Sequence, residues 1–90
     1  MGNDKFMELC KSIVVKSFNE HVDKTDNFKI SEEDVFVVWL SKTLQNNKAL
    51  LSTTVPDGKY YEITYNGEMC EFYLDVYVKL ANVCIPRENI

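Results

Sequence analysis

The residues best suited to chemistry are two glutamates, Glu62 and Glu71, which turn signals place opposite each other on neighbouring strands. Two carboxylates held close together raise the pKa of one of them, and such a pair can perform acid/base catalysis or bind a cation. The same arrangement is more often structural, because a neighbouring lysine bridges the two groups or solvent screens them. We therefore favour a structural role for the pair and keep chemistry as the alternative.

His21, the only histidine, falls near the middle of the apolar arc of the predicted N-terminal helix, one turn from its end. A histidine there can cap terminal carbonyls and interact favourably with the negative end of the helix dipole. A role as general base or ligand would need a nucleophile or second ligand nearby, and no residue offers one with recognisable spacing. We favour the capping role.

The three cysteines, Cys10, Cys70 and Cys84, lack the close spacing of a redox or zinc motif, and their number is odd. All three lie among apolar neighbours, where a free cysteine acts as a small hydrophobe, and this usage is typical of a reducing compartment. The acidic run at residues 32–34 lacks the glycine and alternating ligands of a calcium loop. The sequence therefore predicts no catalytic residue, no cofactor and no metal site.

Composition and charge exclude further classes of protein. The chain has 90 residues, of which 46% are hydrophobic and 27% charged, enough for one domain with one core. Its formal net charge is −4 and its basic residues are scattered, whereas nucleic-acid binding needs clustered cations. No stretch approaches the ~20 apolar residues that span a bilayer, and the N-terminus lacks the apolar run of a secretory signal. We expect a cytoplasmic protein that binds neither nucleic acid nor membrane.

The chain begins with a pattern typical of an amphipathic helix over about residues 3–22. Six apolar side chains fall on one broad arc at 100° per residue: Phe6, Leu9, Cys10, Ile13, Val14 and Phe18. Residues 22–27 carry turn chemistry and should end the helix. Ser31 and Asp34 imitate a capping box, but the β-branched and aromatic run that follows favours a strand over a second helix.

Turn signals divide the rest of the chain into a four-stranded antiparallel meander, with strands at about 35–44, 49–55, 59–65 and 68–74. Residues 56–58, Pro-Asp-Gly, suit a three-residue hairpin loop, and residues 66–67, Asn-Gly, suit a two-residue type I′ turn. Residues 46–47, Asn-Asn, indicate the first hairpin more weakly. The predicted fold is α+β, with the N-terminal helix packed on one face of this sheet.

These loops set the strand register and therefore the face on which each side chain lies. Ile63 should lie opposite Cys70 and also opposite Leu51, and Tyr61 should lie opposite Phe72. The predicted inner face carries Ala49, Leu51, Tyr61, Ile63, Tyr65, Cys70, Phe72 and Leu74. A turn at residues 46–47 would add Val38, Leu40, Leu44 and, awkwardly, Lys42, but one inserted loop residue would reverse that assignment.

The opposite face is the candidate interaction surface. Trp39, Tyr60 and Tyr73 should share one cross-strand row with Thr54. Glu62 and Glu71 should share the next row with Ser41 and Ser52. Aromatic residues are enriched at binding hot spots, so this face could bind a partner or a second copy.

A second interpretation makes the same face part of the core. Asp75 can cap a short helix over about residues 75–84 that Pro86 ends, and this helix could fold back over the aromatic row. The alternative for this segment is that the last strand continues beyond Leu74.

Four segments carry a resemblance to known proteins: DKTD at 23–26, VFVVW at 35–39, LQNNKALLSTT at 44–54 and DGKYYEITYNG at 57–67. They resemble a family of short uncharacterised proteins encoded by phages and prophages of Gram-positive bacteria, over roughly residues 6–84. The resemblance implies a phage or prophage origin and a place in the host cytoplasm. It supplies no activity and no functional residue.

The function expected from these observations is that of a non-enzymatic accessory protein that acts through protein–protein contact. Its partner would be a second copy of itself, or an unidentified phage or host protein. One alternative is a small-molecule-binding domain or enzyme that uses Glu62, Glu71 and His21 in a pocket. The other is an inhibitor whose acidic surface engages a basic host protein.

Overall fold

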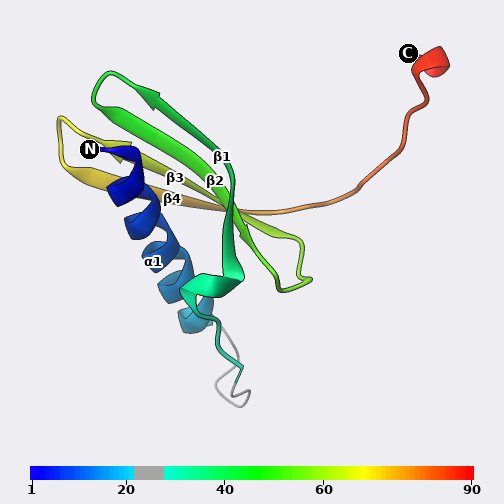
Figure 1. Ribbon diagram of the computed structural model, residues 1–90. Helices are drawn as coiled ribbons and strands as arrows, with labels where there is room; N and C mark the ends of the chain where they lie inside the picture. The colour runs from blue at the N-terminus through cyan, green and yellow to red at the C-terminus, as the bar shows by residue number, and fades with distance from the viewer. Residues whose placement is uncertain (22–27) are drawn as a thin grey trace.

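The computed structural model describes residues 1–21 and 28–90. One helix packs against one face of a four-stranded antiparallel sheet with strand order β1-β2-β3-β4, which confirms the predicted α+β meander (Figure 1). The helix and strands have these bounds: α1 Asn3–His21, β1 Val35–Thr43, β2 Asn46–Thr53, β3 Lys59–Asn66 and β4 Glu71–Val78. Two single turns of 3-10 helix complete the described chain: η1 Glu32–Asp34 and η2 Arg87–Asn89.

α1 packs on the sheet through a stripe of residues spaced four apart. Phe6, Cys10, Val14 and Phe18 are buried along it, and this spacing keeps them on one side of a helix with 3.6 residues per turn. The end of α1 is attached to the chain before the sheet, because the Asn19 side chain donates to and accepts from the backbone of Ile30 at 3.2 Å and 3.0 Å. The predicted turn at residues 22–27 lies outside the described residues.

The predicted capping box forms but opens only one turn of 3-10 helix. The Asp34 carboxylate accepts a hydrogen bond of 2.9 Å from the Ser31 N–H. β1 begins at the next residue, Val35, as the β-branched run predicts. The Asp34 carbonyl also accepts from the Thr54 N–H at 2.9 Å, so η1 is joined to the end of β2.

The β3–β4 hairpin differs from the predicted two-residue turn. Asn66 pairs with Glu71, so four residues form the loop, and Ile63 lies opposite Leu74 instead of Cys70. The Asn66 side chain accepts hydrogen bonds from the N–H groups of residues 68 and 69, and this local bonding competes with a tight turn. Pairing shifts by four residues along β4, an even number, so the side chains of β4 keep their predicted faces. Cys70 is the exception to the predicted inner face, because it lies in the loop and is exposed.

The β2–β3 loop is also longer than predicted. Leu51 lies opposite Tyr61, whereas the sequence placed Leu51 opposite Ile63. The Asp57 side chain accepts a hydrogen bond of 3.0 Å from the Lys59 N–H. Gly58 takes the left-handed conformation with φ 72°. This shift of two residues again preserves the faces.

The first hairpin turns at Leu44 and Gln45 and not at the predicted Asn-Asn pair, since Thr43 pairs with Asn46. A β-bulge between Val37 and Trp39 then changes which side chains of β1 point inward. Leu40 lies opposite Ala49 and therefore on the inner face, as predicted, although the predicted turn would have placed Leu44 opposite Ala49.

The bulge and turn overturn the rest of the β1 assignment. The inner face receives Val35 and Val37, while Val38 is half exposed. Leu44 lies in the turn and is 91% exposed, which contradicts its predicted place in the core. Lys42 has the inner-face register but is exposed, because it lies next to the turn at the end of the hairpin.

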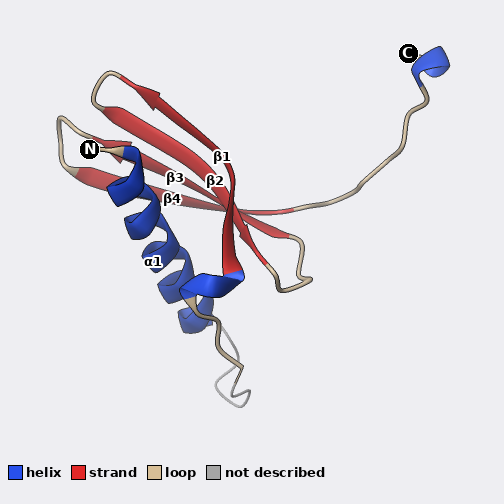
Figure 2. Ribbon diagram, viewed as in Figure 1, coloured by secondary structure: helices blue, strands red, loops and turns tan. Residues whose placement is uncertain are grey.

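The predicted helix over residues 75–84 is wrong, and the alternative of a longer last strand is correct. β4 continues to Val78 because Val76, Tyr77 and Val78 pair with β3 and favour an extended backbone. Residues 79–86 form neither helix nor strand, and η2 follows them (Figure 2). The Lys79 N–H donates to the Gly58 carbonyl at 2.7 Å, which keeps the chain in line with β4 where it leaves the sheet.

Candidate binding face of the sheet

α1 covers only one of the two faces of the sheet (Figure 1). The side chains that alternate away from α1 form what we call the outer face. Its apolar and aromatic members are Phe36, Trp39, Leu50, Tyr60, Tyr73 and Tyr77. Its charged members are Lys48, Glu62, Glu71 and Asp75. Within residues 1–21 and 28–90, no helix or further strand packs against the outer face.

The three aromatic residues predicted to share a row lie on the same face but in different rows. Trp39 lies opposite Leu50, Tyr60 opposite Tyr77, and Tyr73 opposite Thr64. The longer loops shift the register by two and four residues, which separates the rows without changing the face. The aromatic groups are therefore distributed across the outer face instead of forming one line.

Sequence reasoning missed two aromatic members of the outer face. Tyr77 was missed because the last strand was ended at Leu74, although the alternation of Tyr73, Asp75 and Tyr77 is a strand signal. Phe36 was missed because the bulge after Val37 reverses the faces of β1, and nothing in the local sequence marks that bulge. Phe36, Trp39, Tyr73 and Tyr77 are each 41–52% exposed, so about half of each side chain remains available for contact.

Glu62 and Glu71, which were predicted to lie opposite each other, are not a pair. Glu62 lies opposite Asp75, and Glu71 lies opposite Asn66. The Lys48 ammonium is 2.6 Å from a Glu62 carboxylate oxygen, and this hydrogen bond and the negative charge raise the pKa of Lys48. Lys48 therefore binds Glu62 alone and does not bridge the predicted pair of glutamates.

Glu71 is held by a different partner on its own strand. The Tyr73 hydroxyl donates to a Glu71 carboxylate oxygen at 2.5 Å. This hydrogen bond to Glu71 and its negative charge raise the pKa of Tyr73. Both glutamates thus have a hydrogen-bonding partner on the outer face, and their positions do not bring two carboxylates to one reacting group.

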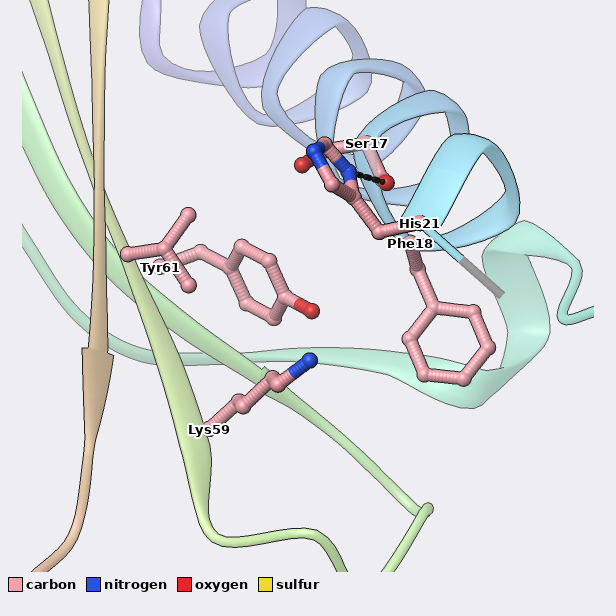
Figure 3. Close-up of a pocket in the computed structure, with 6 residues that line it drawn as sticks. Ser17, Phe18, His21, Lys59 and Tyr61 are labelled. Carbon is pink, nitrogen blue, oxygen red and sulfur yellow. Dashed lines mark hydrogen bonds between the residues drawn. The ribbon is translucent and has the colours of Figure 1, made fainter. Parts of the chain in front are cut away.

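His21 lies on the other side of the sheet. Its Nδ1 is 2.7 Å from the Ser17 carbonyl oxygen, so this nitrogen carries the hydrogen and donates it, as predicted for a residue that caps the helix end. Beside it is a small cavity of about 160 Å³ between α1 and β3. Figure 3 shows Tyr61 and Lys59 extending toward the space beside His21.

This cavity does not bring together the residues of the predicted pocket. Its lining comprises Ser17, Phe18, His21, Lys59, Tyr61 and Val76. Glu62 points to the opposite side of β3 from Tyr61 by strand alternation, and Glu71 lies on that same outer face. Burial raises the pKa of Tyr61, as does the nearby charge of Asp57.

A second hollow, of about 190 Å³, lies at the β1–β2 turn end of the sheet. It is lined by Ser41, Thr43, Asn46, Asn47, Lys48 and Thr64. The Asn47 amide nitrogen donates to the Met1 carbonyl at 3.3 Å, and its oxygen is buried without a partner.

The cysteines occupy two kinds of environment. Cys10 is buried on the side of α1 that faces the sheet, and this burial raises the pKa of its thiol to about 12. Cys70 and Cys84 are exposed, whereas the sequence placed all three among apolar neighbours. Across the described ranges, no group of three His, Cys, Asp or Glu side chains is positioned to hold a metal ion. In the same ranges, no helix is both long and apolar enough to cross a membrane.

Comparison with known proteins identifies the family but no characterised relative. Searches of curated proteins and of solved structures return no match. The model of a family of unknown function, DUF6275, matches residues 7–87, from the first turns of α1 to the beginning of η2. Because the match covers most of α1, the whole sheet and most of the segment after it, the chain belongs to the family of unknown function DUF6275.

Proposed function

We propose that this chain is a non-enzymatic accessory protein that works through protein–protein contact, and that it binds its partner through the outer face. The observation that carries this proposal is the composition of that face. Trp39 and the tyrosines belong to the residue types that dominate binding hot spots. A fully buried aromatic side chain covers roughly 150–250 Å². These four rings are about half exposed, so association could bury about half of that area for each of them.

The charges of the outer face suit an interface as well. Lys48 is bound to Glu62, and Glu71 accepts from Tyr73. The free-energy cost of removing water is smaller for charged groups that already have partners than for isolated charges. The centre of the face can therefore be desolvated at lower cost than its number of carboxylates suggests.

The resemblance to phage and prophage proteins extends the proposal to the setting of the protein. The partner would be a second copy, another phage protein or a host protein in the cytoplasm of a Gram-positive bacterium. The exposed thiols of Cys70 and Cys84 are in keeping with a reducing compartment.

Site-specific photo-crosslinking in a Gram-positive host tests this proposal. A photoreactive residue replaces Tyr73 on the outer face, or Lys16 on the exposed side of α1 as the matched control. We expect adducts from position 73 that are absent from position 16. Excess unlabelled protein should compete for them, and the double variant Trp39→Asp/Tyr77→Asp should not. The same adducts at both positions, or equal competition by the double variant, would contradict the proposal.

The charge of the outer face favours one version of the proposal, in which the protein inhibits a basic host protein. The face carries three carboxylates, Glu62, Glu71 and Asp75, against one ammonium, that of Lys48. Attraction to a basic surface would accelerate association at low salt and weaken as salt screens it. Crosslinking yields that do not change between low and high ionic strength would count against this version.

A further inference from the structure

The chain exposes more surface than a single folded chain of its length requires. Its accessible surface is 6676 Å², whereas a monomer of this size is expected to expose about 5,400 Å². Its radius of gyration is 15.3 Å, against about 12 Å for a compact domain of 90 residues. The excess of roughly 1,300 Å² exceeds the ~800 Å² that each partner buries in a standard interface.

Part of this excess lies in residues 79–90, which we call the C-terminal arm. The arm leaves the end of β4 and runs away from the rest of the molecule (Figure 1). Every residue of it is exposed, although Leu80, Val83 and Ile85 are apolar and are 61–99% exposed. Among the described residues, the outer face of the sheet is a second uncovered apolar surface, and the inner side of β4 is a third, where Phe72, Val76 and Val78 are 36–65% exposed.

The arm is directed away from the outer face of its own chain. The Lys79 N–H bonds to the Gly58 carbonyl at 2.7 Å, so the arm begins as a continuation of β4 beyond the end of the sheet. A return over its own sheet would need a reversal directly after this bond. Between Lys79 and Pro86 the only residue typical of a turn is Asn82, and there is no glycine. The surface that the arm can reach without breaking this geometry belongs to another molecule.

The arm and the outer face match in length and in charge. Eight extended residues span about 26 Å, while the axes of four adjacent strands span about 14 Å. One arm can therefore cross the whole outer face. The arm carries Lys79 and Arg87 against Glu88, a net charge of +1. The outer face, with three carboxylates and one ammonium, has a net charge of −2.

We infer that two copies of this chain exchange their arms, each arm lying across the outer face of the other copy. The two contacts are equivalent, as a two-fold axis requires. The exchange covers the apolar arm and the aromatic face in one step. This inference rests on the proposed function, because it uses the same face, and it names the partner as a second copy.

The decisive experiment measures the mass of the full-length chain by sedimentation equilibrium from about 1 to 500 μM, a range that brackets micromolar interfaces. The arm variant is Leu80→Asp/Val83→Asp, which changes side chains that are 99% and 71% exposed in the single chain. The control is Leu44→Asp, an equally exposed leucine in the β1–β2 turn, far along the chain from the arm. Circular dichroism of each variant verifies that the sheet is formed.

We expect the parent chain and the control to form a dimer, and the arm variant to dissociate at least tenfold more readily. A variant of the face, Tyr73→Asp/Tyr77→Asp, should be monomeric alone and should form a heterodimer when mixed with the arm variant, because one intact arm then meets one intact face. A parent chain that stays monomeric at 500 μM overturns the exchange, as does a dimer that the arm variant does not weaken.

These outcomes are separable from those of the proposed function. A monomeric parent chain whose crosslinks still map to position 73 would overturn the exchange while the outer face remains a binding surface. A dimer that the arm variant abolishes and the face variant leaves intact would overturn the exchange too, and would show that the arm binds elsewhere.

Discussion

Two adjacent leucines in β2 provide a matched test of a sheet that is covered on one face only. Leu51 is fully buried beneath α1, and its neighbour Leu50 points to the outer face, where it is half-buried. Both belong to the same residue type in the same central strand. Replacing each one by alanine therefore removes the same atoms from opposite sides of the sheet.

The structure assigns the two substitutions different costs. Leu51→Ala leaves a cavity in a packed core, which lowers the free energy of unfolding by about 3 kcal/mol. Leu50→Ala removes a partly exposed side chain and should cost about 1 kcal/mol in the single chain. A domain of 90 residues has a total stability of roughly 5–13 kcal/mol, so the first change is a large fraction of the total.

The assay is equilibrium unfolding in urea, followed by far-UV circular dichroism and by the fluorescence of Trp39, the only tryptophan. With a slope of about 1 kcal/mol per molar urea, Leu51→Ala should lower the midpoint by roughly 3 M and Leu50→Ala by about 1 M. The cost of Leu50→Ala should rise with protein concentration, because a second copy covers that leucine. Equal costs for both leucines in dilute protein would refute the reasoning, since they would mean that the chain covers both faces itself.

Three further predictions concern single groups. Gly67→Ala should destabilise the chain by about 2 kcal/mol in urea unfolding, because a Cβ there would clash with the Gln45 carbonyl oxygen. An unchanged midpoint would contradict the close approach of the two turns. The bond to Glu62 raises the pKa of Lys48 in the folded chain. The stability that this ion pair contributes is therefore present below the ordinary lysine pKa and is lost as pH rises through the raised value. Glu62→Gln should reduce this loss of stability in unfolding curves recorded between pH 9 and about pH 12. In thiol titration at neutral pH, Cys10 should react only after denaturant is added, because its thiol is buried and its pKa is about 12; rapid reaction of all three cysteines in the folded protein would contradict its burial.

Periodicity was sufficient to predict α1 and the four strands of this fold, although not the end of the last strand. The spacing of Phe6, Cys10, Val14 and Phe18 predicted α1, and the alternating segments between turn residues predicted the four strands. The inner face of β2, β3 and β4 was also predictable, because both register errors were even numbers of residues and side chains alternate with a period of two.

Features that depend on contacts distant in sequence were not predictable. The Asn-Gly pair at 66–67 indicates a tight turn, but Gly67 is needed where the β1–β2 turn approaches it, and its N–H donates to the Asn46 side chain at 3.2 Å. The bulge near Val38 has no local signal, yet it decides which side chains of β1 face α1.

The end of β4 was predicted wrongly for another reason, because the sequence there fits both a helix and a strand. Asp75 could cap a helix with Val76 and Leu80 on one side, and it could equally alternate with Tyr73 and Tyr77 in a strand. Pairing with β3 selects the strand. The sequence therefore predicted an outer face with aromatic and acidic side chains. The cross-strand rows of this face and two of its aromatic members were found only in the structure.

Hydroxyl-radical footprinting, read residue by residue with mass spectrometry, tests most directly whether α1 leaves one face of the sheet uncovered. In protein diluted to the monomer, Trp39, Tyr73 and Tyr77 should be oxidised readily, and Phe6 and Tyr61 should be protected. Protection of Trp39 and Tyr77 in the dilute monomer, or oxidation of Tyr61 as fast as that of Tyr73, would contradict a sheet with one covered and one open face.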